Sequence, residues 1–220
     1  MQVSHCFQKI TSCSERSRSG IFLDRRMKIA VILGSIRKIR RGARVAKWVM
    51  SQLSKRKDIA VELLDLLDYP LPFYDESNSP DSLNGIYAAQ GATKWVAKIK
   101  EADAFIIITP EYNHGPPAVL KNALDYVYEE WNKKPVAFVS YASGAAAGVR
   151  AVEQLRTNTI DLQMAPIRAA VHISHVMDTI SEDGKLLSGH YNERLADVME
   201  QLLWWAEALK IARDKSTIQD

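Results

Sequence analysis

The chain has 220 residues, a length that suits one domain of ordinary size or slightly more. Apolar residues make up 47% of the sequence and charged residues 25%, as expected of a folded domain with an ordinary core. No apolar run approaches the ~18–20 residues that a membrane-spanning helix needs, so we expect no membrane anchor. The five basic and two acidic residues of positions 1–26 account for the net charge of +3. Because the rest of the chain is neutral, a surface for nucleic acid is not indicated.

Residues 1–26 form a leader that is rich in Ser and Arg and has no helical or strand periodicity. We interpret it as a disordered tail or an upstream start, with Met27 as the working start. A transit peptide is an alternative that its two acidic residues weaken, and a secretory signal lacks the necessary apolar segment. Both cysteines, Cys6 and Cys13, lie in this leader. We therefore expect residues 27–220 to form a single domain without disulfides, which suits a reducing compartment such as the cytoplasm.

Beyond the leader, apolar runs alternate with stretches whose apolar residues recur every three or four positions. The runs predict buried strands, and the other stretches predict amphipathic helices. In chain order we predict a strand at 28–33, a helix at 42–55, a strand at 59–65, a turn-rich connection through Pro70, Pro72 and 77–85, a helix at 93–101, a strand at 104–109, a helix at 120–131, a strand at 135–141, a helix at 149–160, a strand at 169–173 and a long helix at 195–209.

Five alternating strand and helix units predict an α/β fold with a parallel sheet and helices on both faces. Right-handed crossovers leave few topologies, and five strands favour a flavodoxin-like three-layer sandwich with strand order 2-1-3-4-5. Ligands of such sheets bind beyond the carboxyl ends of the strands, where the order reverses between strands 1 and 3. The loops that begin at Gly34, Pro110 and Ala142 are therefore the candidate site.

The first loop runs Gly34-Ser35-Ile36-Arg37-Lys38-Ile39-Arg40-Arg41-Gly42. Gly34 permits a sharp turn, and the helix that begins near Gly42 points its positive end into the loop. Groups suited to phosphate oxygens come from Ser35, Arg37, Arg40 and Arg41. A solvated basic loop is the alternative, but four like charges at this edge of the sheet favour a bound anion. The Walker pattern and the GxGxxG fingerprint are both absent from the sequence.

The second loop, Thr109-Pro110-Glu111-Tyr112-Asn113-His114-Gly115-Pro116-Pro117, contains three prolines and one glycine and should be stiff. Tyr112 offers a flat ring and Asn113 a two-way amide, so a planar heterocycle suits this loop. Taken singly, Tyr112 could cover the core, Asn113 could cap a turn and His114 could be an ordinary surface histidine. Their concentration beside the basic loop favours a ligand.

The third loop, Ala142-Ser143-Gly144-Ala145-Ala146-Ala147-Gly148, consists of small residues. Small side chains let a ligand approach the backbone closely. The alanines are equally compatible with the first turn of a helix packed against the sheet. Both interpretations stay open from the sequence.

Together these loops resemble the NADPH-dependent FMN reductase family of flavodoxin-like proteins, which includes quinone, azo-dye and chromate reductases. The similarity covers roughly 27–173. Its most specific part is Pro110-Glu111-Tyr112-Asn113 followed by Leu120-Lys121-Asn122-Ala123-Leu124-Asp125. Gly34-Ser35-Ile36-Arg37 and Arg150-Ala151-Val152-Glu153-Gln154-Leu155-Arg156 are also similar to the family.

The resemblance implies that the first loop holds the FMN phosphate through Ser35 and Arg37, and that residues 110–113 meet the isoalloxazine ring. It places the third loop at the pyrimidine end of the ring. The cofactor-binding residues we expect are Gly34, Ser35, Arg37, Arg40, Arg41, Gly42, Pro110, Glu111, Tyr112, Asn113, Ser143 and Gly144. Family members stack the nicotinamide on the flavin and form homodimers or tetramers. Two departures are Arg40, where many members carry a serine, and the scarcity of glycine after the fourth strand.

The function we predict is an FMN-dependent oxidoreductase that passes hydride from NADPH or NADH to a small acceptor in a ping-pong reaction. The acceptor classes are a quinone, free flavin, an azo compound or a metal oxyanion. We expect no catalytic triad and no metal; N–H groups of the Tyr112–Asn113 loop would stabilise the reduced ring, and His114 could protonate a quinone. The alternatives are a non-catalytic flavodoxin-type electron carrier, although such carriers are usually shorter and acidic, and a scaffold that has lost the flavin.

Overall fold

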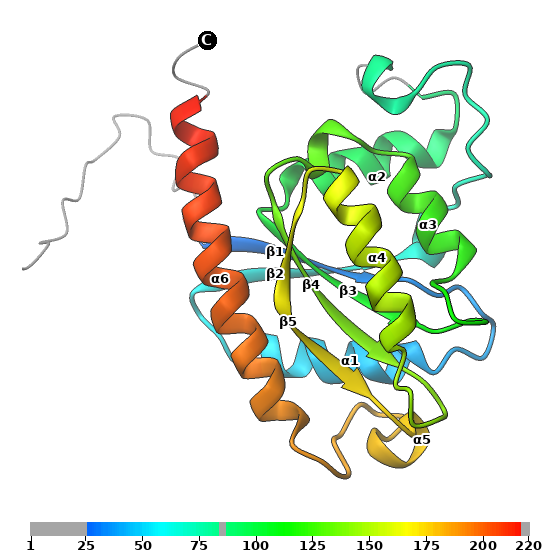
Figure 1. Cartoon of the computed structure of the whole chain (residues 1–220), viewed down its shortest axis with the longest axis vertical. Helices are drawn as coiled ribbons and strands as arrows, with labels where there is room; N and C mark the ends of the chain where they lie inside the picture. The colour runs from blue at the N-terminus through cyan, green and yellow to red at the C-terminus, as the bar shows by residue number, and fades with distance from the viewer. Residues whose placement is uncertain (1–25, 84–86, 217–220) are drawn as a thin grey trace, which may run out of the picture.

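The computed structural model describes residues 26–83 and 87–216, so the interpretations of Cys6, Cys13 and positions 1–25 lie outside the described residues. Five parallel strands form one sheet in the order β2-β1-β3-β4-β5 (Figure 1). They are β1 (Met27–Leu33), β2 (Ile59–Asp65), β3 (Ala104–Pro110), β4 (Pro135–Tyr141) and β5 (Ala165–Ile173). The predicted strands, their order and the flavodoxin-like fold are confirmed. Strand β5 begins four residues before the predicted start, in a stretch where Pro166 and the exposed Arg168 interrupt the apolar pattern.

Helices cover both faces of the sheet (Figure 1). They are α1 (Gly42–Leu53), α2 (Gln90–Glu101), α3 (Ala118–Asp125), α4 (Val149–Asp161), α5 (Val176–Thr179) and α6 (Tyr191–Ser216), with short 3-10 helices at Leu66–Asp68, Pro80–Ser82 and Glu129–Trp131. Among the described residues, no helix combines the length and the apolar character needed to cross a membrane.

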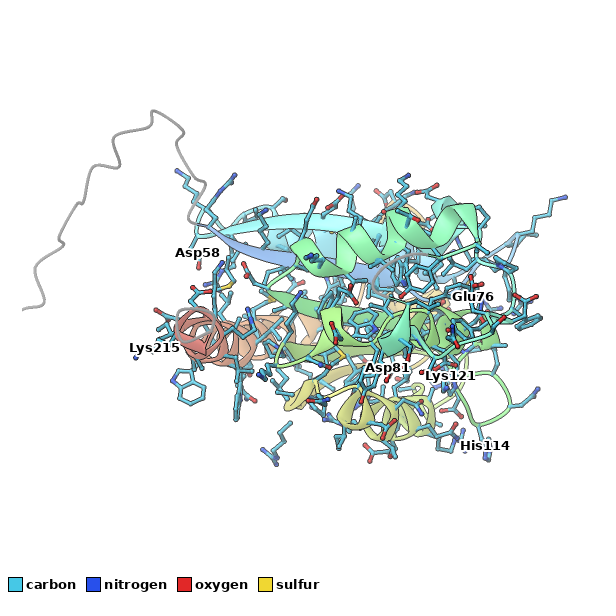
Figure 2. The ribbon with its side chains drawn as sticks, turned by 90° about the horizontal axis from the view of Figure 1, so that it is seen from above. Asp58, Glu76, Asp81, His114, Lys121 and Lys215 are labelled. Atoms are coloured by element: carbon cyan, nitrogen blue, oxygen red, sulfur yellow. The ribbon has the colours of Figure 1, made fainter. Side chains whose placement is uncertain are left out.

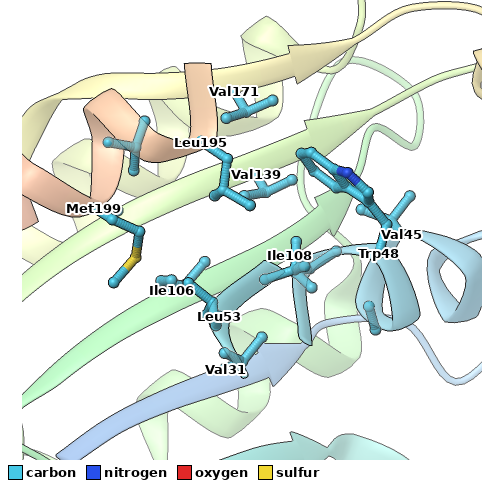
Figure 3. Close-up of a cluster of buried hydrophobic side chains, with 14 of the residues drawn as sticks. Val31, Val45, Trp48, Leu53, Ile106, Ile108, Val139, Val171, Leu195 and Met199 are labelled. Carbon is cyan, nitrogen blue, oxygen red and sulfur yellow. The ribbon is translucent and has the colours of Figure 1, made fainter. Parts of the chain in front are cut away.

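Successive side chains of the central strand β3 pack into the cores on opposite faces of the sheet, because side chains of a strand alternate between its two faces. Ile106 and Ile108 of β3 pack with residues of α1 and α6 (Figure 3). Phe105 and Ile107 pack on the other face, with residues of α2, α3 and α4. The central strands are therefore buried on both sides, which explains why β3 and β4 appear in the sequence as continuous apolar runs.

The helix predicted at 120–131 ends earlier, because α3 stops at Asp125. Beyond it, Trp131 is fully buried in a 3-10 turn and packs edge-on against Phe105, with ring centroids 4.8 Å apart. Its indole nitrogen donates to the Leu124 carbonyl at 3.2 Å. The apolar spacing therefore reports burial correctly, but a turn rather than a continued helix achieves that burial.

For α4 the spacing of apolar residues predicts an inner face made of Val149, Val152, Leu155 and Ile160, and the structure differs at both ends of this set. Val149 and Ile160 are exposed, whereas Val152, Leu155 and Thr159 face the sheet. The hydroxyl of Thr159 donates to the carbonyl of Arg156, which allows this polar side chain to be buried. The prediction is therefore right for Val152 and Leu155 and wrong at the two ends of the helix, where Thr159 is buried in place of Ile160.

The amino ends of the strands are closed by a cluster around Asp103. Its carboxylate accepts hydrogen bonds from the Lys28 amide at 3.0 Å and from the Lys210 ammonium at 2.8 Å. Helix α6 is thereby fixed across this end of the sheet. The opposite edge, where the carboxyl ends of the strands lie, is left to the loops.

Candidate active site

The three loops predicted to form the site meet around one pocket of about 400 Å³ at the carboxyl edge of the sheet. Figure 2 shows His114 of the second loop at the opposite end of the molecule from Asp58 and Lys215. The pocket is lined by Arg37, Ile39, Arg40, Arg41, Pro110, Glu111, Tyr112, Tyr141, Ala142 and Ser143. Its volume lies within the range of small-molecule and cofactor sites.

Glycines set the path of the first loop. The amide of Gly34 donates to the Ile108 carbonyl at 2.9 Å, and a Cβ at this position would lie 2.8 Å from the Leu120 side chain. Helix α1 begins at Gly42, where a Cβ would collide with the hydroxyl of Tyr141. Among the described residues, no side chain caps this helix, and its first turn contains no acid. The amides of Ala43 and Arg44 donate to the Arg40 and Arg41 carbonyls at 3.4 and 3.2 Å, so it is the dipole of α1, not balanced by an acid, that favours an anion here.

The guanidinium of Arg40 forms an ion pair with the carboxylate of Asp65. The guanidinium makes two hydrogen bonds to Asp65 and a third, at 2.9 Å, to the Ser35 carbonyl. The two side chains are only 14% and 17% exposed. Hydrogen bonding to Asp65 raises the pKa of Arg40, so the guanidinium stays charged. Arg40 lines the pocket, but much of its hydrogen-bonding capacity is used inside the protein.

The second loop is a tight turn. Tyr112 and Gly115 form an antiparallel bridge, with N···O distances of 2.9 and 3.0 Å. Between them Asn113 and His114 adopt positive φ angles of 49° and 70°. The Tyr112 amide is used in this bridge, which leaves the amides of Asn113 and His114 without a partner among the described residues. The His114 side chain is exposed and does not line the pocket.

Tyr112 also joins the second loop to the first. Its hydroxyl lies 2.9 Å from that of Ser35, and Ser35 is fully buried. The guanidinium of Arg37 sits over the Tyr112 ring, 5.7 Å from the centroid. Such a cation–π contact holds an otherwise exposed arginine at the pocket wall.

Two side chains of helix α4 form hydrogen bonds to the second loop. The carboxylate of Glu111, only 6% exposed, accepts from the Arg150 side chain at 2.6 Å and from the Arg150 amide at 3.2 Å. The Gln154 amide donates to the His114 carbonyl at 2.7 Å. Because its carboxylate is occupied by Arg150, Glu111 acts here as a support for the turn.

The third loop turns through Ala147 and Gly148, with φ angles of 54° and 82°. The Ser140 hydroxyl donates to the Ala147 carbonyl at 2.7 Å and lies 2.7 Å from Nδ1 of His172. Since the hydroxyl hydrogen is used, Nδ1 of His172 acts as the donor to Ser140. Burial, together with the charge of Arg156, lowers the pKa of His172 and favours this neutral form.

Of the twelve predicted cofactor residues, seven line the pocket: Arg37, Arg40, Arg41, Pro110, Glu111, Tyr112 and Ser143. The other five do not. Gly34, Ser35 and Gly42 are buried behind the first loop, while Asn113 and Gly144 are exposed at its rim. Sequence reasoning missed Ile39, Ala142 and Tyr141, of which Tyr141 ends β4 and could have been found from its place at the carboxyl edge. Burial raises the pKa of Tyr141, so its phenol stays protonated near neutral pH.

The residues of the pocket fit a phosphorylated planar cofactor. Arg37 and Arg41 make no ion pair with a carboxylate in the part of the chain that the structure describes, and Arg41 bridges to the Ser143 hydroxyl across the pocket. Two such cations beside the start of α1 suit a phosphate. The turn beside the pocket has two amides, of Asn113 and His114, without a partner among the described residues, which are suitable donors for the polar edge of a ring.

A flavodoxin-like sheet with a cationic pocket at its switch point is typical of proteins that bind a phosphorylated ring cofactor at the carboxyl edge. The family model for NADPH-dependent FMN reductases matches residues 27–178. The chain belongs to this family. It is an oxidoreductase whose cofactors are FMN and a nicotinamide nucleotide.

Known relatives agree with this assignment. An NAD(P)H-dependent FMN reductase of Schizosaccharomyces pombe is 38% identical over 146 residues, which cover 66% of this chain and 72% of the relative. An NADPH azoreductase of a Bacillus species is 32% identical, covering 73% and 86%, and a quinone reductase of Pseudomonas putida is 29% identical, covering 72% and 83%. Among solved structures, the flavoenzyme NAD(P)H:(acceptor) oxidoreductase FerB of Paracoccus denitrificans has a TM-score of 0.68 at 23% identity, covering 83% of this chain and 98% of FerB.

Proposed function

We propose that the chain reduces small two-electron acceptors with NADPH or NADH in a ping-pong reaction, and that FMN binds in the pocket formed by the three loops. The observation that supports this most strongly is the pocket itself, because cations from the first loop and the turn of the second loop face the same 400 Å³ space. When bound, FMN supplies the redox chemistry by accepting a hydride and passing two electrons on.

In this proposal Arg37 and Arg41 bind the phosphate, aided by the positive end of α1. Gly34 and Gly42 allow the backbone to approach it closely, and Ser35 orients Tyr112 behind it.

Around the ring, Pro110, Tyr112 and Ser143 form the walls. The amides of Asn113 and His114, which have no partner among the described residues, would stabilise the negative charge that develops on the reduced ring. Gly144 is open, because a Cβ there would meet no atom within 4 Å, so the acceptor has room to enter at this rim.

The acceptors we propose are small compounds that take up two electrons. The azoreductase and the quinone reductase among the relatives favour azo compounds and quinones for this chain as well. Free flavin and metal oxyanions are further candidates. The proton that a quinone needs could come from His114 at the rim of the site, or from water.

A homodimer or tetramer is part of the proposal. The segments that follow β1 and β2 expose four large apolar side chains, Ile36, Ile39, Leu67 and Phe73, of which Ile39 lines the pocket and is 89% exposed and Phe73 is 77% exposed. Large apolar side chains exposed at one edge of the sheet are candidates for burial in a subunit interface. We also propose a cytoplasmic location, since residues 27–220 contain no cysteine for disulfides.

Steady-state kinetics test the proposed reaction. With NADPH or NADH varied at several fixed concentrations of benzoquinone, a ping-pong mechanism gives parallel double-reciprocal lines. Intersecting lines would contradict the mechanism. The absence of turnover with quinone, azo dye and free flavin alike would leave the electron carrier as the better description.

A further inference from the structure

We propose that Asp65 is a positioning residue for the phosphate of the flavin, acting through Arg40. The inference rests on the proposed site at the first loop. Asp65 is the last residue of β2 and lies in register with Leu33, the last residue of β1. The loop that would cradle the phosphate therefore starts beside this carboxylate, although Asp65 itself does not line the pocket.

A hydrogen bond to the backbone just after β2 fixes the side chain of Asp65. Its carboxylate accepts from the Leu67 amide at 3.0 Å and so caps the short helix Leu66–Asp68. The same carboxylate makes a two-point contact with the Arg40 guanidinium, with 2.5 Å between Oδ1 and the first of the two nitrogens. A planar fork held at two points leaves the arginine little rotational freedom.

Arg40 transmits this restraint to the loop. Its guanidinium donates to the Ser35 carbonyl at 2.9 Å, from the same nitrogen that contacts Asp65. Three of its five N–H groups are therefore used within the protein. The carbonyl of Ser35 fixes the direction of the peptide that leads to Arg37. In this way Asp65 sets the geometry of the loop without touching the ligand.

Arg40 could either bind the phosphate or position the loop together with Asp65, and these two roles predict opposite changes of FMN affinity in Asp65→Asn. If Arg40 were chiefly a phosphate ligand, removal of a nearby negative charge would free the guanidinium and tighten the binding of an anion. If the Arg40–Asp65 pair positions the loop, the same substitution weakens FMN binding. Asparagine keeps an oxygen for the Leu67 amide, so the cap at the end of β2 is retained.

The experiment measures the dissociation constants of FMN and of riboflavin with the flavin-free full chain, by flavin fluorescence. Riboflavin lacks the phosphate, so its affinity reports on the ring site alone. We expect Asp65→Asn to weaken FMN binding roughly tenfold and to change riboflavin binding by less than about twofold. Asp68→Asn, an exposed acid three residues further on, is the matched control and should leave both constants unchanged.

Arg40→Gln and the double variant Arg40→Gln/Asp65→Asn complete the test. If the pair acts as a unit, each single variant loses about as much FMN affinity as the double variant. Tighter or unchanged FMN binding in Asp65→Asn overturns the inference, and so does an equal loss of FMN and riboflavin affinity. In those cases wild-type FMN binding still supports the proposed function. A wild-type chain that binds neither flavin overturns both proposals.

Discussion

The hydroxyl of Tyr112 lies 2.9 Å from the hydroxyl of Ser35, which is fully buried beneath it. This contact joins the loop after β3 to the loop after β1. The two loops are separated by 77 positions in the sequence but form one wall of the pocket. Contacts between the loops therefore organise the site.

The contact predicts a stability change in Tyr112→Phe. Loss of the phenol removes one hydrogen bond from a buried hydroxyl, which should lower the free energy of unfolding by about 1 kcal/mol. Urea unfolding of the flavin-free protein measures this, because bound FMN would add its own stabilisation. Tyr128→Phe is the control, since its hydroxyl has a single long contact of 3.5 Å with Gln163 and its loss should change little. Equal stability of the wild type and Tyr112→Phe would show that the contact is not made in solution.

Arg37→Ala should weaken retention of FMN. A charge-assisted hydrogen bond to a phosphate contributes about 1.5–3 kcal/mol, so the dissociation constant should rise roughly tenfold to a hundredfold. The flavin content of the purified protein and a fluorescence titration both measure this. Lys55→Ala, an exposed cation beyond the far end of α1, serves as the control. Unchanged flavin content in Arg37→Ala would remove its assigned role.

Gly148 and Gly144 of the third loop should respond differently to alanine. Gly148 has a φ of 82°, and a Cβ there would lie 2.8 Å from Cβ of Ser140. We expect Gly148→Ala to lower the free energy of unfolding by about 1–3 kcal/mol, from backbone strain and crowding. Gly144→Ala meets no atom within 4 Å and should stay within about 0.5 kcal/mol of the wild type. Thermal unfolding measures the two variants. Equal melting temperatures for Gly148→Ala and Gly144→Ala would contradict this account.

The burial of Lys134 should make the free energy of unfolding depend on pH. Lys134 is buried at the amino edge, where its ammonium donates to the carbonyls of Ile99 and Lys100. Burial lowers the pKa of Lys134 to about 8, from a usual value near 10.5. Between these two pH values the unfolded chain binds more protons than the folded chain, so this group makes the free energy of unfolding rise with pH.

The measurement compares the wild type with Lys134→Met in urea at pH 7.5 and pH 10. Because the variant lacks the titrating group, the stability of the wild type relative to the variant should increase between the two pH values. The full effect is on the order of 2–3 kcal/mol. Lys100→Met, an exposed neighbour, should show no comparable change. A relative stability that falls with pH would show that Lys134 is not held in the way described.

The centre of the sheet could be predicted from the sequence because β3 and β4 are buried at every position and so appear as unbroken apolar runs, whereas the edge strands β2 and β5 have exposed positions. Strand β3, with Phe105, Ile107 and their neighbours, is the clearest case. The break between α3 and Trp131 could not be predicted, since the spacing of apolar residues reports burial and not the backbone path. Thr159 illustrates the same limit, because a hydrogen-bonded hydroxyl occupies an inner position of α4.

The place of the site followed from topology, but the use of its side chains did not. Arg37, Arg40 and Arg41 look alike in the sequence as candidate phosphate ligands. Only the structure shows that Arg40 has a carboxylate partner at the end of β2, 25 positions away. Glu111 likewise looks like a ligand contact, although its carboxylate is bound to Arg150. Such pairings depend on how strands and helices are placed beside one another, which no local pattern records.

The most direct test of the central claim is the visible absorption spectrum of the purified protein before and after anaerobic addition of NADPH. The account predicts flavin bands in the purified or FMN-reconstituted protein, and their prompt bleaching by NADPH as the bound cofactor is reduced. Protein that shows no flavin bands even after reconstitution with FMN would contradict the account. Flavin bands that persist with both NADPH and NADH would instead identify an electron carrier reduced by another protein.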